Sequence, residues 1–332
     1  MLSSKNIYNV IGVMSGTSLD GIDLCYSEFT LKESHWSFSI KTCETILYNE
    51  YWAEKLSQAN NFHDTILFDL DKEYTSYLAT VINDFIKKYQ IANIDFISSH
   101  GHTVYHQPEE NYTFQLGNRI ELRELIKKPI VCDFRVQDVA LGGQGAPLVP
   151  IGDLLLFKDF SHCINLGGFC NISIKNDSQI IAYDICPVNV VLNYLSKKIG
   201  FSFDKDGNHA KSGSVNKQLL KDLNQIEYYV EEPPKSLGIE WVKENIFKII
   251  DNYNITNEDK LRTYTEHICS QIAVNIDGDH PQILFTGGGV KNKFLMARLS
   301  KKMKKKFQLP EIEIIDFKAV SYTHLRAHET FA

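Results

Sequence analysis

Asp184 has surroundings that are typical of a general base. It closely follows the apolar residues 180–182, which predict a strand that ends near it, and Pro187 comes shortly afterwards. A carboxylate at the end of a strand can accept a proton from water or from a hydroxyl group. The same residue type at this place is equally typical of a cap on the following helix, so the spacing leaves both interpretations open.

Three glycine-rich turns could present backbone N–H groups to an anion. Glycine has no Cβ and tolerates positive φ, so its N–H can approach a phosphate closely, and Thr or Ser hydroxyls add donors. Each turn alone also fits an ordinary turn, and none is a Walker A loop, because no Gly-Lys-Ser/Thr follows. The candidate nucleotide-binding residues are Gly16, Thr17, Ser18, Leu19, Asp20, Gly21, Ile22, Asp23, Gly167, Gly168, Gly287, Gly288 and Gly289.

Asp20 is the candidate metal partner. A carboxylate beside phosphate-binding N–H groups would repel the phosphate unless Mg²⁺ lies between them, bound directly or through water. One glycine turn lies in the first half of the chain and two lie in the second, an order that predicts a nucleotide held between two domains. Phosphoryl transfer from ATP, with Mg²⁺ to neutralise charge and a base on the acceptor, would use all of these parts.

A further polar group lies near the predicted domain junction. Arg135 and Asp138 could bind a carboxylate or phosphate, and an interdomain salt bridge fits them equally. Residues 98–106 carry three histidines, including His100, at a predicted junction of strand and loop. No carboxylate or cysteine lies at a convincing metal spacing, so we expect these histidines to hydrogen-bond substrate or loop. Residues 204–207, Asp-Lys-Asp-Gly, predict a turn rather than a calcium loop.

The elements that must position these groups follow an α/β pattern that occurs twice. Residues 7–14 and 19–29, on either side of a tip at 15–18, predict the two strands of a hairpin, and a second strand, glycine turn and strand at 162–174 opens the other half. The loop at 140–147 is rich in glycine and proline and marks the junction. Further strands are expected at 94–98, 129–133 and 282–286, and helices at 51–58, 67–88, 190–198, 239–252 and from about 292.

Composition restricts the possible classes of protein. The 332 residues are 43% hydrophobic and 23% charged, which favours two globular domains. The net charge of −6 and interspersed charges argue against nucleic acid as a partner, and the lysine-rich residues 301–306 predict the solvated end of a helix. No segment resembles a secretory signal or a membrane span, so we expect a cytoplasmic protein. Seven cysteines without a Cys-x-x-Cys pair argue against a disulfide framework or a zinc site.

Eight ordered motifs resemble those of the anhydro-N-acetylmuramic acid kinases. The resemblance extends from residue 9 to about 318 and implies two RNase H-like domains of the actin/Hsp70/hexokinase type that flank an ATP cleft. The first, 1–140, would carry the phosphate hairpin, and the second, 141–318, the base and the adenosine loop. The motifs lie at residues 13–23, 99–108, 133–138, 142–150, 165–168, 204–207, 233–236 and 286–292.

The resemblance also implies an unusual reaction. Family members open the 1,6-anhydro bond of anhydro-N-acetylmuramic acid with water and move the γ-phosphate of ATP to O6, which gives N-acetylmuramic acid 6-phosphate during cell-wall recycling. Asp184 would then deprotonate the attacking water. His100, Arg135, Asp138 and Asn189 would contact the sugar. ATP and Mg²⁺ are the implied cofactors, an anhydro-amino-sugar is the implied substrate, and a homodimer is a family expectation.

The chain departs from the family pattern at three places. Ile185, Cys186 and Val188 stand where the family commonly has smaller residues, which predicts a bulkier and drier site. His102 stands where glutamine is usual. Residues 319–332 lack the family's final glutamate-bearing helix, look truncated or foreign, and receive no role. Two other functions therefore stay open: a conventional hexose or amino-sugar kinase, and a catalytically impaired ATP-binding sugar sensor.

Overall fold

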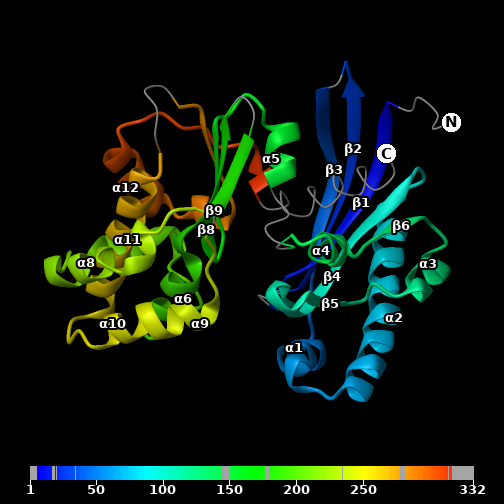
Figure 1. Cartoon of the computed structure of the whole chain (residues 1–332), viewed down its shortest axis with the longest axis horizontal. Coiled ribbons are helices and arrows are strands. Elements are labelled where there is room, and N and C mark those ends of the chain that lie inside the picture. Colours follow the sequence, from blue (N-terminus) through cyan, green and yellow to red (C-terminus); the bar gives the residue numbers. More distant parts are fainter. Residues whose placement is uncertain are drawn as a thin grey trace. The chain divides into compact units, whose positions relative to one another are not determined.

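The structure is a computed structural model that describes residues 6–16, 19, 21–33, 35–143, 145, 150–176, 179–233, 235–276, 281–312 and 314–315 (Figure 1). The described chain divides into two compact units, unit 1 up to Leu156 and unit 2 from Phe157. Each unit has its own sheet and its own hydrophobic core, so the predicted α/β class with two sheet-containing parts is confirmed. The predicted tail at 319–332 lies outside the described residues.

Unit 1 is built on a six-stranded mixed sheet with the order β3-β2-β1-β4-β5, in which β6 also pairs with β4. The predicted first hairpin forms, because β1 and β2 pair antiparallel, but its second strand begins at Gly21 rather than at Leu19, which has φ +59° and lies in the turn. β1 also pairs with β4 in parallel, which places β4 in the middle of the sheet. The strands are β1 (Ile7–Ser15), β2 (Gly21–Lys32), β3 (His35–Leu47), β4 (Phe96–Gln107), β5 (Tyr112–Leu116) and β6 (Ile130–Val131).

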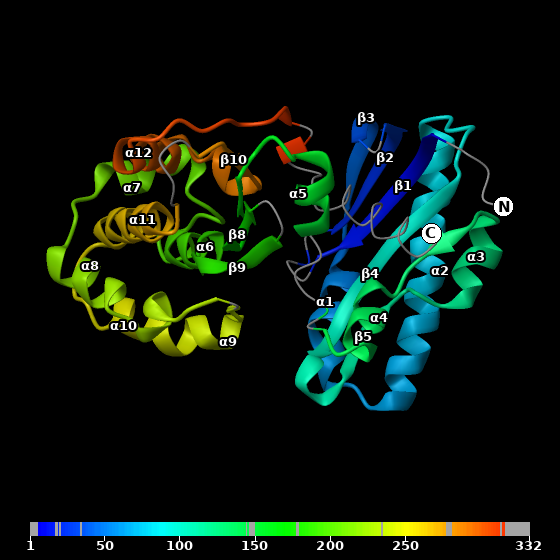
Figure 2. The same ribbon diagram turned by 45° about the horizontal axis from the view of Figure 1, so that its top comes forward.

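The long helix α2 runs along this sheet and supplies much of the core of unit 1 (Figure 1 and Figure 2). Leu70, Tyr74, Leu78, Ile82 and Phe85 recur at helical spacing on one face of α2 and are all buried. They pack with apolar residues of β1, β2 and β4. The helices of unit 1 are α1 (Glu50–Gln58), η1 (Ala59–Asn61), α2 (Asp64–Lys88), η2 (Pro108–Glu110), α3 (Ile120–Ile126), α4 (Phe134–Ala140) and α5 (Pro150–Leu156).

Unit 2 has a four-stranded sheet with the order β10-β7-β8-β9. β7, β8 and β9 form an antiparallel meander, and β10 pairs with β7 in parallel. This order leaves β9, which carries Asp184, at an edge of the sheet. The strands are β7 (His162–Leu166), β8 (Phe169–Asn176), β9 (Gln179–Pro187) and β10 (Ile283–Thr286).

Helix α11 is the centre of the helical layer of unit 2. It contacts α6, α8 and α12, and Figure 2 shows it beside α12 and α6. The Tyr264 hydroxyl donates to the Pro187 carbonyl at 2.9 Å and so links α11 to the end of β9. The helices of unit 2 are α6 (Asn189–Lys197), η3 (Lys205–Gly207), α7 (Asn208–Ser212), α8 (Lys217–Asn224), η4 (Glu227–Val230), α9 (Ile239–Val242), the π-helical η5 (Lys243–Phe247), α10 (Lys248–Asp251), α11 (Asn257–Val274), η6 (Gly288–Lys291) and α12 (Lys293–Met303).

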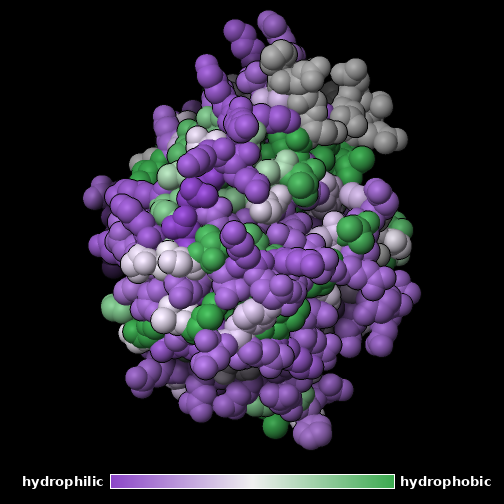
Figure 3. Space-filling view, turned by 90° about the vertical axis from the view of Figure 1, so that its left-hand side faces the viewer, coloured by the Kyte–Doolittle hydropathy of each residue, from purple (hydrophilic) through white to green (hydrophobic). Residues whose placement is uncertain are grey.

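The surface of unit 2 that faces the viewer in Figure 3 is mostly hydrophilic, and its apolar residues are scattered. Single exposed apolar side chains of this kind are normal on a protein surface. Within the described residues, no helix combines the length and the apolar character that a bilayer crossing requires.

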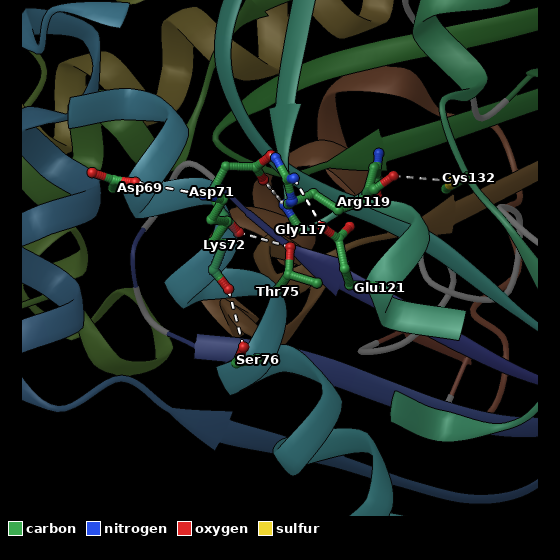
Figure 4. A network of polar contacts seen from close by, with 10 residues as sticks. Asp69, Asp71, Lys72, Thr75, Ser76, Gly117, Arg119, Glu121 and Cys132 are labelled. Carbon is green, nitrogen blue, oxygen red and sulfur yellow. Dashed lines mark hydrogen bonds and ion pairs between the residues drawn. The ribbon is translucent and has the colours of Figure 1, made fainter. Parts of the chain in front are cut away.

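A buried carboxylate ties α2 to the turn that follows β5 (Figure 4). Asp71 is only 6% exposed, and its two oxygens accept from the Gly117 N–H at 2.8 Å and from Arg119 at 3.3 Å. Arg119 also pairs with Glu121 at 2.9 Å. Burial raises the pKa of Asp71, although both donors act in the opposite direction. The contacts of Asp71 with Gly117 and Arg119 therefore hold the turn against α2, at the cost of removing the carboxylate from water.

We expect Asp71→Ala to lower the free energy of unfolding by about 2–4 kcal/mol, because the change leaves the Gly117 N–H and the Arg119 guanidinium without their acceptor. Urea unfolding followed by circular dichroism measures this. Asp69 is the matched control, since its side chain is 79% exposed and pairs with Lys72 at 3.8 Å. Asp69→Ala should change stability by less than about 0.5 kcal/mol, and equal losses in the two variants would contradict the role of Asp71.

Candidate functional site

Asp184 lies in β9 beside a bulge and is held by three residues from a later part of the chain. Its Oδ2 accepts from the Leu237 N–H at 2.9 Å, and its own N–H donates to the Lys235 carbonyl at 3.1 Å. The Tyr228 hydroxyl donates to the Asp184 carbonyl at 2.6 Å. The bulge arises because Asn171 lies opposite Asp184 while Cys170 lies opposite Cys186. These contacts fix both the backbone and one carboxylate oxygen of Asp184.

Burial raises the pKa of Asp184 to about 6, and the single Leu237 N–H only partly offsets the loss of solvation. Within the described part of the chain, no donor contacts the second oxygen, Oδ1. A carboxylate of this kind is ionised near neutral pH and still binds a proton more strongly than an ordinary aspartate. Both properties suit a general base.

The family departures around Asp184 belong to the core rather than to an open surface. Ile185, Cys186 and Val188 are each no more than 1% exposed and pack in the main cluster of unit 2. They therefore explain the dry surroundings of Asp184, as the sequence predicted. Because the three side chains are buried, they do not reduce the space of a solvent-exposed binding site.

The two glycine turns of unit 2 lie side by side at one end of its sheet, because β10 runs parallel to β7 and Thr286 lies opposite Asn165. Gly287 has φ +83°, and a Cβ there would lie 2.5 Å from the Asn165 Oδ1. A Cβ on Gly289 would lie 2.8 Å from the Leu166 Cβ. At Gly288 nothing lies within 4 Å of the Cβ position, so a ligand could approach the backbone closely there. These turns fit the predicted nucleotide site.

Asn189 supports the other turn. Its Nδ2 donates to the Gly167 carbonyl at 2.7 Å and to the Leu166 carbonyl at 3.3 Å. The Val188 and Val190 N–H groups donate to the Gly168 carbonyl at 2.8 and 3.3 Å. The start of α6 thus fixes the Gly167–Gly168 turn, and a sugar contact by Asn189 stays a prediction.

The hairpin turn of unit 1 is described in part. Leu19 has φ +59° and its N–H donates to the Gly16 carbonyl at 3.3 Å, which closes the turn. Gly21 begins β2, and a Cβ there would lie 2.4 Å from the Ile46 carbonyl oxygen. Ile22 is fully buried in the core, and Asp23 accepts from the Thr45 hydroxyl at 2.5 Å. Thr17, Ser18 and the candidate metal partner Asp20 lie outside the described residues.

The three histidines lie within β4, which contains a bulge, and not at the predicted junction of strand and loop. The strand does not end near residue 98 but continues to Gln107, so all three histidines lie within it. Val13 pairs with Ser99 and Ser15 with His102, which leaves one extra residue in β4. Gly101 permits this with φ +69°, and a Cβ there would lie 2.5 Å from the Leu116 carbonyl oxygen.

Three of the predicted sugar-binding residues form one cluster in unit 1. Arg135 Nε donates to His100 Nε2 at 2.9 Å, and His100 Nδ1 bonds the Gly101 carbonyl at 2.9 Å. These partners assign a neutral imidazole with its proton on Nδ1. Burial and the Arg135 charge lower the pKa of His100 to about 3. Arg135 also donates to the Gly145 carbonyl at 2.8 Å, and Asp138 accepts from the Gly145 N–H at 2.6 Å.

The predicted turn at 204–207 is confirmed and packs beside the third glycine turn. The Asp204 carboxylate accepts from the N–H groups of His209 and Ala210, both at 2.9 Å, which satisfies the start of α7. Gly207 has φ +72°, and a Cβ there would lie 2.3 Å from the Oδ1 of Asn292, the N-cap of α12. Among the described residues, no cluster of three or more metal-ligating side chains occurs here or elsewhere.

Sequence reasoning missed Tyr228, Lys235 and Leu237 as partners of Asp184. The motif at 233–236 marked this part of the chain, but nothing in the motif says which backbone groups face Asp184. The partners lie 44 to 53 residues away in sequence. Two of them, Lys235 and Leu237, contribute main-chain atoms, which any residue type possesses.

Comparisons with known proteins agree with this geometry. The profile of the family described as "Anhydro-N-acetylmuramic acid kinase" matches residues 8–319. The chain belongs to the anhydro-N-acetylmuramic acid kinase family. It is 34% identical to the anhydro-N-acetylmuramic acid kinase of Pseudomonas syringae pv. syringae, covering 92% of this chain and 85% of the relative. It is 31% identical to the enzyme of that name from Vibrio vulnificus YJ016, covering 98% and 90%.

Family membership confirms the prediction that the chain is an enzyme and a kinase. Among solved structures, component A of the Acidaminococcus fermentans (R)-2-hydroxyglutaryl-CoA dehydratase superimposes with a TM-score of 0.50 and 10% identity. The superposition covers 97% of this chain and 98% of that one. At this identity the likeness concerns the fold alone.

The pKa of Asp184 predicts how stability depends on pH. As pH rises, the unfolded chain loses this proton near pH 4 and the folded chain only near 6. Its contribution to stability is therefore complete below about pH 4 and is lost as pH rises to about 6, by up to roughly 3 kcal/mol. Asp184→Asn cannot titrate, so it should gain stability relative to the natural protein across this range. Urea unfolding at several pH values measures the difference, and a constant difference would show that Asp184 titrates normally.

Proposed function

We propose that the chain is an ATP- and Mg²⁺-dependent kinase that hydrolyses the 1,6-anhydro bond of anhydro-N-acetylmuramic acid and phosphorylates O6. The product would be N-acetylmuramic acid 6-phosphate, formed in the cytoplasm during cell-wall recycling. The observation that carries the proposal is Asp184, a desolvated carboxylate with one oxygen fixed and one available, in a chain of this family. The relatives' names supply the substrate, and the geometry supplies a base suited to it.

Asp184 Oδ1 would accept a proton from water while the water oxygen bonds to the anomeric carbon. The bond between this carbon and O6 breaks at the same centre, and O6 leaves with the electron pair. O6 would then attack the γ-phosphorus of ATP while the bond to the β–γ bridging oxygen breaks and ADP leaves, so ring opening provides the nucleophile for the phosphoryl transfer. When bound, ATP supplies the phosphoryl group and Mg²⁺ neutralises its charge.

The Leu237 N–H has a defined part in this scheme. It holds Oδ2, so the proton goes to Oδ1 and the carboxylate keeps one orientation. The Tyr228 hydroxyl and the Lys235 carbonyl hold the main chain of Asp184 and prevent the edge strand from moving away. Asp184 therefore acts from a rigid position.

The polar groups of the sugar are assigned to the cluster of His100, Arg135 and Asp138, as the family resemblance implied. Both ring nitrogens of His100 are bonded within the protein, Nε2 to Arg135 and Nδ1 to the Gly101 carbonyl, so His100 would orient the Arg135 guanidinium toward the sugar. The Gly145 loop is held by Arg135 and Asp138, so sugar binding and loop position would be linked.

Asp184→Asn should lower kcat by about 10²–10⁴-fold, because the amide cannot take the proton. Affinity for ATP should stay within about twofold. In the natural protein, kcat/KM should rise with pH up to about 6 as Asp184 ionises. Asp251→Asn is the control, since Asp251 pairs with Lys198 on the surface, and it should keep full activity. Normal turnover by the Asp184 variant would exclude Asp184 as the base.

The reaction class can be established with ¹⁸O-labelled water. Incubation with Mg-ATP and the anhydro sugar should give a sugar phosphate that carries one ¹⁸O at the anomeric carbon, as seen by mass spectrometry. The matched substrate is free N-acetylmuramic acid, which has a free O6 and needs no ring opening. Phosphorylation of the free sugar alone would favour a conventional amino-sugar kinase and contradict the proposal.

A further inference from the structure

A largely buried chain of hydrogen bonds passes through Ser15, the last residue of β1, which directly precedes the hairpin turn of unit 1. The Tyr74 and Tyr48 hydroxyls lie 2.6 Å apart, and the Tyr48 hydroxyl lies 2.6 Å from the Ser15 Oγ. The Ser15 Oγ lies 2.8 Å from the His102 Nδ1. The chain thus joins α2, the loop before α1, the end of β1 and the bulged part of β4.

Three of the four members of the chain are buried, and Tyr48 is partly buried. Tyr74 is fully buried, and Ser15 and His102 are each 3% exposed. Burial lowers the pKa of His102 to about 4, so its imidazole is neutral at ordinary pH and Nδ1 can donate to or accept from Ser15. Loss of one member would leave a buried polar group without its partner, which is costly in a dry environment.

Ser15 is the last point at which β1 is held before the turn. It pairs with Ile22 across the hairpin and with His102 across the parallel ladder, and Gly16 begins the turn directly afterwards. On the far side, Gly21 lies close to the Ile46 carbonyl, and the side chain of Ile22 is buried in the core. On the near side, the hydrogen bonds of the Ser15 side chain add to its strand pairs.

We propose that His102 is a positioning residue for the hairpin turn that begins at Gly16: together with Tyr48 it holds Ser15, at the entry to the turn, in the orientation in which the turn binds nucleotide phosphate. The inference rests on the proposed function in one respect, that this turn binds the nucleotide. His102 itself would touch neither nucleotide nor sugar. Glutamine, the residue usual in the family, can make the same hydrogen bond to Ser15 and should serve in its place.

The test compares four variants in the full chain. His102→Leu removes the hydrogen-bonding atoms, His102→Gln keeps one, and Tyr48→Phe removes only a hydroxyl. Ser98→Ala is the control, because Ser98 lies in the same strand, is fully buried and has an Oγ without a hydrogen-bond partner among the described residues. Two measurements are made: hydrogen exchange of peptides that cover residues 14–22, without ligand, and kinetics with Mg-ATP and the anhydro sugar.

His102→Leu and Tyr48→Phe should speed exchange at 14–22 and raise KM for ATP about tenfold, while KM for the sugar and exchange elsewhere stay near their natural values. His102→Gln and Ser98→Ala should resemble the natural protein. Exchange and KM for ATP unchanged in both disrupted variants would overturn the inference. Faster exchange throughout unit 1, or failure of His102→Gln to restore KM, would also overturn it, since either result indicates a general structural role.

The exchange experiment keeps this inference separate from the proposed function. If the natural protein does not turn over the anhydro sugar, the proposed reaction fails. ATP binding, measured by calorimetry in the same variants, then replaces KM in the comparison. If the natural protein binds no ATP, the nucleotide part of the inference fails as well, whatever the exchange shows.

Discussion

Desolvation of one carboxylate governs the chemistry of this fold. Asp184 sits on an edge strand over a core that includes Ile185, Cys186 and Val188, and only one N–H compensates its charge. Additional donors would return its pKa toward the ordinary value of an aspartate and weaken it as a base, whereas complete burial would keep it protonated. The observed environment lies between these limits. The Tyr228 and Lys235 contacts fix the main chain of Asp184 in this environment.

The bulge in β4 plays a comparable part in unit 1. The strand has one extra residue and Gly101 at positive φ, and two of its imidazoles, those of His100 and His102, form hydrogen bonds with different parts of unit 1. His100 bonds Arg135 and thereby the Gly145 loop, while His102 bonds Ser15 at the entry to the glycine turn. Both rings are buried and neutral, so they work as fixed hydrogen-bonding groups rather than as charges. In a regular strand, His100 and His102 would lie on the same face because they are two residues apart, and the extra residue in β4 interrupts this alternation.

Local sequence predicted most elements near the site, and its failures have physical causes. The β1–β2 hairpin, the glycine turns and the turn at Asp204 follow from side-chain type and glycine content, which act over a few residues. Helix α11 was not predicted, because its buried side includes polar residues such as Lys260, Glu266 and His267, which hide the apolar period. Glu266 is acceptable there because Arg298 of α12 binds both its oxygens, a contact that no local pattern reveals.

The sequence by itself determined the family, the kind of chemistry and most candidate residues, because the order of motifs and the residue types can be recognised without knowing which residues are in contact. Tertiary structure decided what those residues do to one another. Burial raises the pKa of Asp184, and a donor 53 residues away partly opposes this, while Ser15 bonds a histidine 87 residues away. It also showed that Asn189 holds the Gly167–Gly168 turn. Burial and hydrogen-bond distance are properties of packed segments that lie far apart in the chain, so only the folded molecule specifies them.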